Sequence, residues 1–127
     1  MIIPKNLSHI IVNISISYLD TPFDLERFNC VHFVRKVYKT VGVTLPLLCG
    51  HDFPPKEFHL TEQEFNLMPV GHSVFFRRKL SPSNRVWTHV AIIISDSQLI
   101  HCTRHCGMGV VCTEKKEFLE IYSLVVQ

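Results

Sequence analysis

One cysteine in this chain stands where a thiol can act as a nucleophile. Cys30 lies in the segment RFNCVHFVRKVY, residues 27–38, whose apolar side chains recur at the spacing of an amphipathic helix. Asn29 is a residue type preferred at helix N-caps, so the helix is expected to begin at Cys30. The unpaired N–H groups and the dipole of a helix N-terminus can lower the pKa of a thiol, more strongly beside a protonated histidine. The alternative interpretation is a small cysteine buried in the core.

Two histidines are the best candidates for a base beside this thiol. His89 and His101 fall in the consecutive predicted strands THVAIIIS and QLIHCT, which the residues Ser95-Asp96-Ser97 separate. If these residues form the loop, the two histidines share one sheet face as diagonal neighbours, with backbones about 7–8 Å apart. A two-residue turn would place them on opposite faces instead.

These three side chains together have the chemistry of nucleophilic acyl transfer, which needs a thiol, a base and a group that holds the base in one tautomer. We expect Cys30 to be the nucleophile, His89 the base and His101 the orienting residue. This requires the helix of Cys30 to pack on the sheet face that carries both histidines. For either histidine alone, a hydrogen-bonded structural role in the sheet is the competing interpretation.

The elements that must position these side chains change in character along the chain. Helices are predicted over residues 7–19, from Cys30 to a C-terminal cap at Gly42, and after Thr61, where Glu64 completes a capping box. Beyond this third helix, short β-branched and aromatic runs separated by turn residues predict five strands, mostly antiparallel. Helices followed by a meander of strands indicate an α+β fold.

Length, composition and charge limit the class of protein. A chain of 127 residues with 46% hydrophobic and 19% charged side chains fits one folded domain, residues 1–127. The formal net charge of +2, spread along the chain, argues against nucleic acid as a partner and against a polybasic membrane anchor. The apolar runs are shorter than the about 18 residues of a membrane span, so no span is predicted.

The N-terminal segment and the cysteines bear on localisation. Residues 1–20 are apolar, but His9 and Asn13 interrupt them and no small-x-small cleavage site follows, so we interpret them as mature structure rather than a signal peptide. Five cysteines at irregular spacing do not form a compact disulfide framework and leave at least one free thiol. We expect a protein that is cytoplasmic as synthesised, or exported by a route that uses no signal peptide.

Four short motifs occur in order along the chain. NCVHFVRKVYKTVGVTLP, residues 29–46, is followed by VGHSVFF, residues 70–76, then by HVAI at His89 and LIH at His101. This ordered set resembles the NlpC-type cysteine peptidases, papain-like amidases that cut peptidoglycan stem peptides. The first motif is similar to the one that opens their catalytic helix, with Cys, Phe and Val at matching positions. The resemblance spans residues 18–112.

The resemblance implies a papain-like NlpC-type α+β fold and a thiol-dependent hydrolase that needs no cofactor. It implies amide bonds of peptidoglycan stem peptides as the substrate, with Cys30, His89 and His101 as the catalytic residues. The chain departs from the family pattern at Asn29, where Asp is usual, and at Phe23, where a Tyr often serves the active site.

Substrate contacts are expected from irregular segments between the rigid elements. Residues 47–63 and 77–87 are predicted to form the cleft walls, because such segments commonly carry binding groups. Cationic side chains in the second segment could meet substrate carboxylates, although a solvated cationic loop is the competing interpretation. The candidate substrate-binding residues are Phe23, Arg77, Arg78 and Trp87.

Three alternatives to this function stay open. The chemistry could act on an amide or thioester outside the cell wall, by hydrolysis or acyl transfer, and a secreted effector of this kind could have a cognate inhibitor protein. A catalytically silent binding module could keep the fold without the activity. HCTRHC, residues 101–106, together with Cys112, could bind zinc, although its spacing is not that of a paired knuckle.

Overall fold

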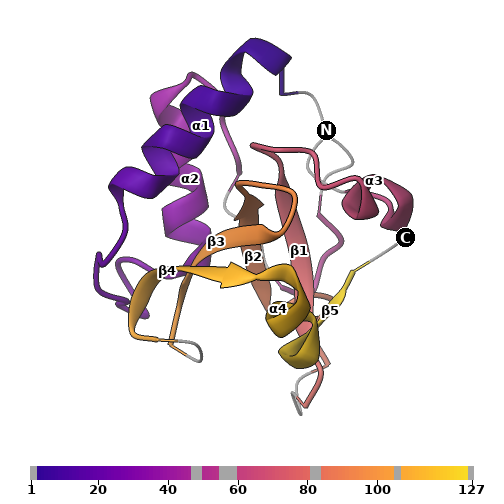
Figure 1. Ribbon diagram of the computed structural model, residues 1–127. Helices are drawn as coiled ribbons and strands as arrows, with labels where there is room; N and C mark the ends of the chain where they lie inside the picture. The colour runs from indigo at the N-terminus through magenta and orange to yellow at the C-terminus, as the bar shows by residue number, and fades with distance from the viewer. Residues whose placement is uncertain (1–2, 47–49, 55–59, 81–83, 105–106, 126–127) are drawn as a thin grey trace.

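The predicted α+β class is confirmed by the structure (Figure 1). The computed structural model describes residues 3–46, 50–54, 60–80, 84–104 and 107–125. Within these residues, the elements in chain order are α1 Lys5–Ser17, α2 Cys30–Thr40, α3 Glu62–Asn66, β1 Ser73–Arg78, β2 His89–Ile93, β3 Gln98–Thr103, β4 Gly109–Glu114, α4 Lys115–Ile121 and β5 Tyr122–Leu124.

The five strands form one antiparallel sheet in the order β4-β3-β2-β1-β5. In the β2–β3 pair, Ile92 lies opposite Ile100, and the Ile94 N–H donates to the Gln98 carbonyl at 3.1 Å. This register confirms the three-residue loop expected from the sequence. The last strand, β5, returns to pair with β1, so the sheet is a meander with its final strand moved to the opposite edge.

Helix α2 begins and ends where its sequence predicts. Asn29 Oδ1 accepts hydrogen bonds from the N–H groups of Val31 and His32 at 3.0 and 3.1 Å, and His32 Nδ1 accepts one from the Asn29 N–H at 3.2 Å. These bonds satisfy donors that a helix N-terminus otherwise leaves unpaired. Gly42 follows the helix with φ +79°, a conformation that glycine adopts without steric cost. Cys30 is therefore fixed as the first residue of the helix.

Two buried clusters lie on opposite faces of the sheet. The face that we call the α2 face carries Val90, Ile92, Ile100 and Cys102, which pack with the apolar side chains of α1 and α2. The opposite face, which we call the histidine face, carries His89, Ala91, Leu99 and His101, and it packs with side chains of α3, α4 and β5. Figure 1 shows the same division, with α1 and α2 together on one side of the sheet and α4 on the other. Because both faces are covered, every residue of β2 is buried.

Helix α4 was not predicted from the sequence. Its seven residues KKEFLEI contain one buried side chain, Phe118, and its N-cap Glu114 makes no side-chain capping bond. A helix this short has little stability of its own in water, so its packing on the sheet must stabilise it. The capping box of α3 is present as expected, with Thr61 Oγ1 accepting from the Glu64 N–H at 3.2 Å.

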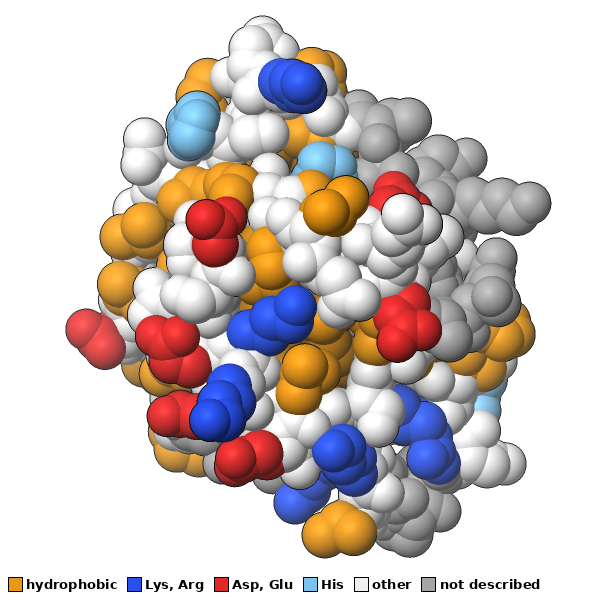
Figure 2. All heavy atoms as spheres, turned by 45° about the vertical axis from the view of Figure 1, so that its right-hand side comes forward, with side chains coloured by type: hydrophobic (Ala, Val, Ile, Leu, Met, Phe, Trp, Pro, Cys, Tyr) orange, Lys and Arg blue, Asp and Glu red, His pale blue; other side chains and the backbone are white. Residues whose placement is uncertain are grey.

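The surface carries charges of both signs. On the face seen in Figure 2, Lys and Arg side chains are interspersed with Asp and Glu and with apolar side chains. Such a mixture creates no strong field of one sign on that face. Among the described residues, no helix is long and apolar enough to cross a membrane.

Candidate active site

The Cys30 thiol lies at the N-terminal end of strand β2. Cys30 opens α2, and its sulfur interacts with the backbone of Val90, the residue that follows His89. The residue keeps partial exposure, but its thiol is enclosed, and this burial raises the pKa of the Cys30 thiol above its ordinary value. Backbone hydrogen bonds from Val90, Val31 and Cys30 itself lower the pKa by less. The helix terminus alone therefore does not produce the lowered pKa that the sequence suggested.

The two histidines meet as predicted. His89 Nε2 lies 2.7 Å from His101 Nδ1, and the two rings are nearly perpendicular, with centroids 4.9 Å apart. Both are buried, and His101 has no exposed surface. Burial disfavours the charged imidazolium and lowers the pKa of His101 to about 4. His101 is thus neutral at pH 7, with one ring N–H.

The packing of the helix against the histidines differs from the prediction. α2 covers the α2 face, with Val90 and Cys102, whereas His89 and His101 point to the histidine face. The expectation that the helix packs on the face carrying the histidines is wrong. Side chains of a strand alternate between faces, and in a strand buried on both faces the sequence gives no sign of which face a given helix covers. The Cys30 thiol meets the backbone of Val90, the residue next to His89, rather than the face that carries the two imidazoles.

Aromatic rings enclose the histidine pair. The His89 ring stacks on Tyr122 with centroids 4.9 Å apart and an interplanar angle of 18°. His101 contacts Phe118 edge-on at 5.1 Å. Phe118 comes from α4 and Tyr122 from β5, which begins directly after that helix. The unpredicted helix and the strand that follows it therefore pack against the two imidazoles.

A further polar contact, which sequence reasoning missed, continues from the histidine pair. His101 Nε2 lies 2.8 Å from Thr113 Oγ1 on strand β4. In the β3–β4 register, His101 lies opposite Val111 and Thr113 lies opposite Leu99, so His101 and Thr113 are diagonal neighbours. The run GVVCT predicts a strand, and the structure has it as β4, but the sequence does not reveal its pairing with β3 or the resulting contact.

The predicted substrate contact Trp87 is largely buried. It keeps 4% of its surface exposed, its Nε1–H donates to the Asp52 carbonyl at 3.0 Å, and its ring packs edge-on against Phe75 at 5.0 Å. These contacts give Trp87 a packing role, and its contact with substrate stays a prediction.

The other predicted substrate contacts lie nearer the surface. The Arg77 Nε–H donates to the Arg85 carbonyl at 3.0 Å, and the Arg78 backbone N–H donates to Thr88 Oγ1 at 2.8 Å. Phe23 is half-buried, with the Arg104 guanidinium 5.9 Å from its ring centroid. Parts of the two predicted cleft walls, residues 47–49, 55–59 and 81–83, lie outside the described residues.

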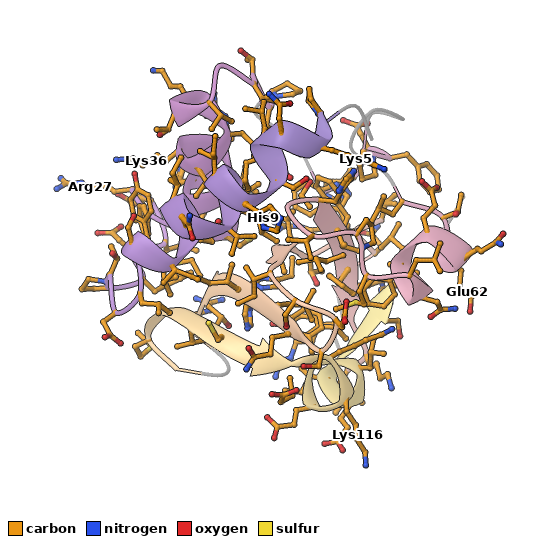
Figure 3. All side chains as sticks on the ribbon, turned by 45° about the horizontal axis from the view of Figure 1, so that its top comes forward. Lys5, His9, Arg27, Lys36, Glu62 and Lys116 are labelled. Carbon is orange, nitrogen blue, oxygen red and sulfur yellow. The ribbon has the colours of Figure 1, made fainter. Side chains whose placement is uncertain are left out.

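Two cationic side chains, Arg27 just before α2 and Lys36 within it, lie on the outer side of the molecule. Figure 3 shows Arg27 and Lys36 projecting outward from this part of the molecule, away from the sheet. The Lys36 ammonium lies 5.8 Å from the ring centroid of Phe28.

The residues considered for zinc are separated by the strand alternation. Cys102 points to the α2 face and its thiol donates to the Phe28 carbonyl at 3.4 Å, while His101 points to the histidine face. His105 and Cys106 lie outside the described residues. In the part of the chain that the structure describes, no three His, Cys, Asp or Glu side chains are grouped for a metal ion.

Comparison with known proteins identifies the fold. No family model and no curated protein matches the sequence. Among solved structures, an NlpC/P60 family protein from Bacillus cereus is 20% identical, with a TM-score of 0.69 over 98% of this chain and 40% of that one. NlpC1 from Trichomonas vaginalis is 14% identical, with a TM-score of 0.73 over 98% of this chain and 44% of that one. The NlpC/p60 domain of the peptidoglycan hydrolase SagA is 23% identical, with a TM-score of 0.61 over 92% of this chain and 95% of the domain. The fold is therefore of the NlpC/P60 type, as the sequence motifs indicated, and the chain spans less than half of the first two proteins.

Proposed function

We propose that this protein is a thiol-dependent hydrolase of amide bonds in which Cys30 is the nucleophile, His89 the base and His101 the residue that orients the base. The observation that carries the proposal is the imidazole pair, 2.7 Å between His89 Nε2 and His101 Nδ1, at the strand end where the Cys30 thiol lies. A pair of buried, directly contacting imidazoles beside a helix-terminal thiol fits nucleophilic catalysis better than it fits a purely structural role.

The proton chemistry follows from the two ring nitrogens of His89. Nε2 faces His101, so we assign proton exchange with the thiol to Nδ1, on the other side of the ring. In the first step, the Cys30 sulfur bonds to the carbonyl carbon while its proton passes to His89. His89 then gives that proton to the leaving amine as the C–N bond breaks. Water attacks the thioester carbonyl while His89 accepts a proton from it. The C–S bond then breaks, and His89 returns the proton to the departing sulfur, which releases the carboxylic product and restores the Cys30 thiol.

The raised pKa of Cys30 fits proton removal by a base during the attack. Because burial raises the pKa of the thiol, little thiolate would exist at pH 7 without a base. A neighbouring imidazole offsets this cost by taking the proton and remaining as a cation beside the sulfur. The backbone N–H of Cys30, at the start of α2, is the proposed donor to the developing oxyanion.

For the substrate, we propose the peptide stem of peptidoglycan, with residues 1–127 acting as one catalytic domain. The support is the likeness in fold to the domain of a protein named as a peptidoglycan hydrolase, which this chain matches over 95% of that domain. Arg77 and Arg78 are the proposed contacts to stem-peptide carboxylates, with Phe23 and Trp87 at the cleft wall.

The direct test is digestion of purified peptidoglycan by the wild-type protein and by Cys30→Ala, followed by mass analysis of the released fragments. Cys112→Ala, which removes an exposed thiol, is the matched control. The proposal predicts stem-peptide fragments from the wild type and the control, and none from Cys30→Ala.

Cleavage or transfer of a different amide or thioester would keep the proposed chemistry and overturn the proposed substrate. Equal cleavage by Cys30→Ala would overturn the nucleophile. No reaction with any acyl substrate would favour the binding module.

A further inference from the structure

We propose that Thr113 is a positioning residue that selects the tautomer of His101 and, through it, the tautomer of His89. The inference rests on the proposed function for its consequence in catalysis, but the tautomers themselves can be observed without a substrate. The carrying observation is a continuous polar chain, His89 Nε2 to His101 Nδ1 at 2.7 Å and His101 Nε2 to Thr113 Oγ1 at 2.8 Å.

The hydrogen-bonded series His89–His101–Thr113 is enclosed, so its donors and acceptors must pair with one another. His101 is fully buried, His89 is 5% exposed and Thr113 is 9% exposed. Phe118 packs against His101 and separates it from bulk water on that side. A buried donor left without an acceptor costs more than an exposed one, because no water replaces the lost bond. The free energy of the folded protein therefore depends on which ring nitrogen carries each proton of this series.

A neutral His101 can carry its proton on either nitrogen, and the two tautomers have opposite effects on whether His89 can accept a proton from the thiol. With the proton on Nε2, His101 donates to Thr113 Oγ1, and its Nδ1 accepts from the Nε2–H of His89. The Nδ1 of His89 then carries a lone pair and can accept the thiol proton. With the proton on His101 Nδ1, that group donates to His89 Nε2, and the proton of His89 moves to Nδ1. In this second case His89 has no basic nitrogen toward the thiol.

Thr113 favours the productive case relative to a side chain without a hydroxyl. Its hydroxyl can accept from the Nε2–H of the productive tautomer or donate to the Nε2 lone pair of the unproductive one, so it satisfies both. Without that oxygen, the productive tautomer would bury an N–H with no acceptor, whereas the unproductive tautomer would bury only an unpaired lone pair. Orphaned buried N–H groups are the rarer and costlier defect. Removal of the hydroxyl is therefore expected to shift His101, and with it His89, toward the tautomer that cannot accept the proton of Cys30.

Three variants separate this role from simple packing. Thr113→Val replaces the hydroxyl by a methyl group of similar size, and Thr113→Ser keeps the hydroxyl. Ile93→Val removes one buried methyl group from the cluster on the same sheet face and controls for a general loss of stability.

Two readouts are needed. Nitrogen-15 NMR of histidine-labelled protein reports which ring nitrogen carries the proton, and steady-state kinetics separate kcat from KM. In the wild type, we expect His101 protonated on Nε2 and His89 protonated on Nε2. In Thr113→Val, we expect the protons on Nδ1 and a fall in kcat on the order of tenfold or more with KM unchanged, since a base in the wrong tautomer loses most of its effect. Thr113→Ser should restore both readouts, and Ile93→Val should change neither.

The outcomes separate the inference from the proposed function. A wild-type His101 protonated on Nδ1, or a Thr113→Val protein with unchanged tautomers, would overturn the role of Thr113 whatever the activity. A tautomer change in Thr113→Val with no change in kcat would overturn its catalytic consequence. If the wild type cleaves no acyl substrate while the tautomers change as expected, the positioning role stands and the proposed function fails.

Discussion

Acidification should destabilise this protein through one buried imidazole. In the fold, burial lowers the pKa of His101 from an ordinary value of 6.5 to about 4. Between these two values the unfolded chain binds a proton that the folded chain does not, so the free energy of unfolding rises with pH. The stabilisation is fully present above pH 6.5 and is lost as the pH falls toward 4.

The magnitude follows from the size of the shift. Each pKa unit corresponds to about 1.4 kcal/mol, so His101 contributes up to about 3 kcal/mol between neutral pH and pH 4. About 2 kcal/mol of this should already be lost at pH 5. A small domain is stable by about 5–15 kcal/mol, so the loss is a large fraction of the total.

The assay is urea denaturation of the wild type and of His101→Gln at several pH values between 4 and 7.5. His101→Gln keeps a polar side chain but cannot take up the proton, so its stability should depend less on pH by about 2 kcal/mol at pH 5. Two other groups also make the free energy of unfolding rise with pH. Burial lowers the pKa of His72, and hydrogen bonds to Thr61 lower the pKa of Glu64. The test therefore compares how steeply the free energy of unfolding depends on pH in the variant and in the wild type. His9→Gln, which removes an exposed imidazole on α1, labelled in Figure 3, is the control for loss of an imidazole elsewhere in the protein.

Two results would refute this reasoning. One is that the free energy of unfolding depends on pH equally steeply, within error, in the wild type and in His101→Gln. The other is an NMR titration of the His101 ring in the folded protein with a midpoint near 6.5, which also covers the case in which His101→Gln fails to fold.

Other predictions follow from the same geometry. The rate of Cys30 alkylation by iodoacetamide should reach half its maximum at a higher pH in His89→Ala than in the wild type, because burial raises the pKa of the thiol and the variant lacks the proposed base that offsets this cost. Equal midpoints would contradict the proposed role of His89 as the base of Cys30. Asn29→Ala should lower the free energy of unfolding by about 1 kcal/mol in urea titrations through loss of the α2 cap, whereas Asn29→Asp should keep it within a few tenths. Gly109→Ala should destabilise by about 1–3 kcal/mol, because a Cβ there would overlap the Thr21 carbonyl oxygen, and an unchanged thermal midpoint would contradict this contact.

The local features of the fold were predictable from the sequence. The cap at Asn29 and the apolar stripe that starts at Cys30 depend on residues within a few positions of one another, and they set the start of α2 without tertiary information. The same holds for the β2–β3 pair, whose short loop fixes the register and brings His89 and His101 together. With a three-residue loop the two imidazoles pair before their surroundings are known, whereas the two-residue turn that the sequence also allowed would have separated them.

Three features were decided by the tertiary structure alone. Which face of the sheet helix α2 covers depends on long-range packing. The alternation of side chains along a strand cannot reveal this when both faces are apolar. The contact of His101 with Thr113 depends on the pairing of β3 with β4, whose loop includes residues outside the described part of the chain.

The raised pKa of Cys30 is the third of these features. A helix N-terminus is visible in the sequence and favours a thiolate, but the burial that opposes it arises only when β2 and α2 enclose the sulfur. The sequence by itself therefore determined which side chains are candidates for catalysis and which pairs can be local neighbours. The tertiary structure determined which faces they occupy and how far they are removed from water, because desolvation is a property of the whole packed structure rather than of any segment.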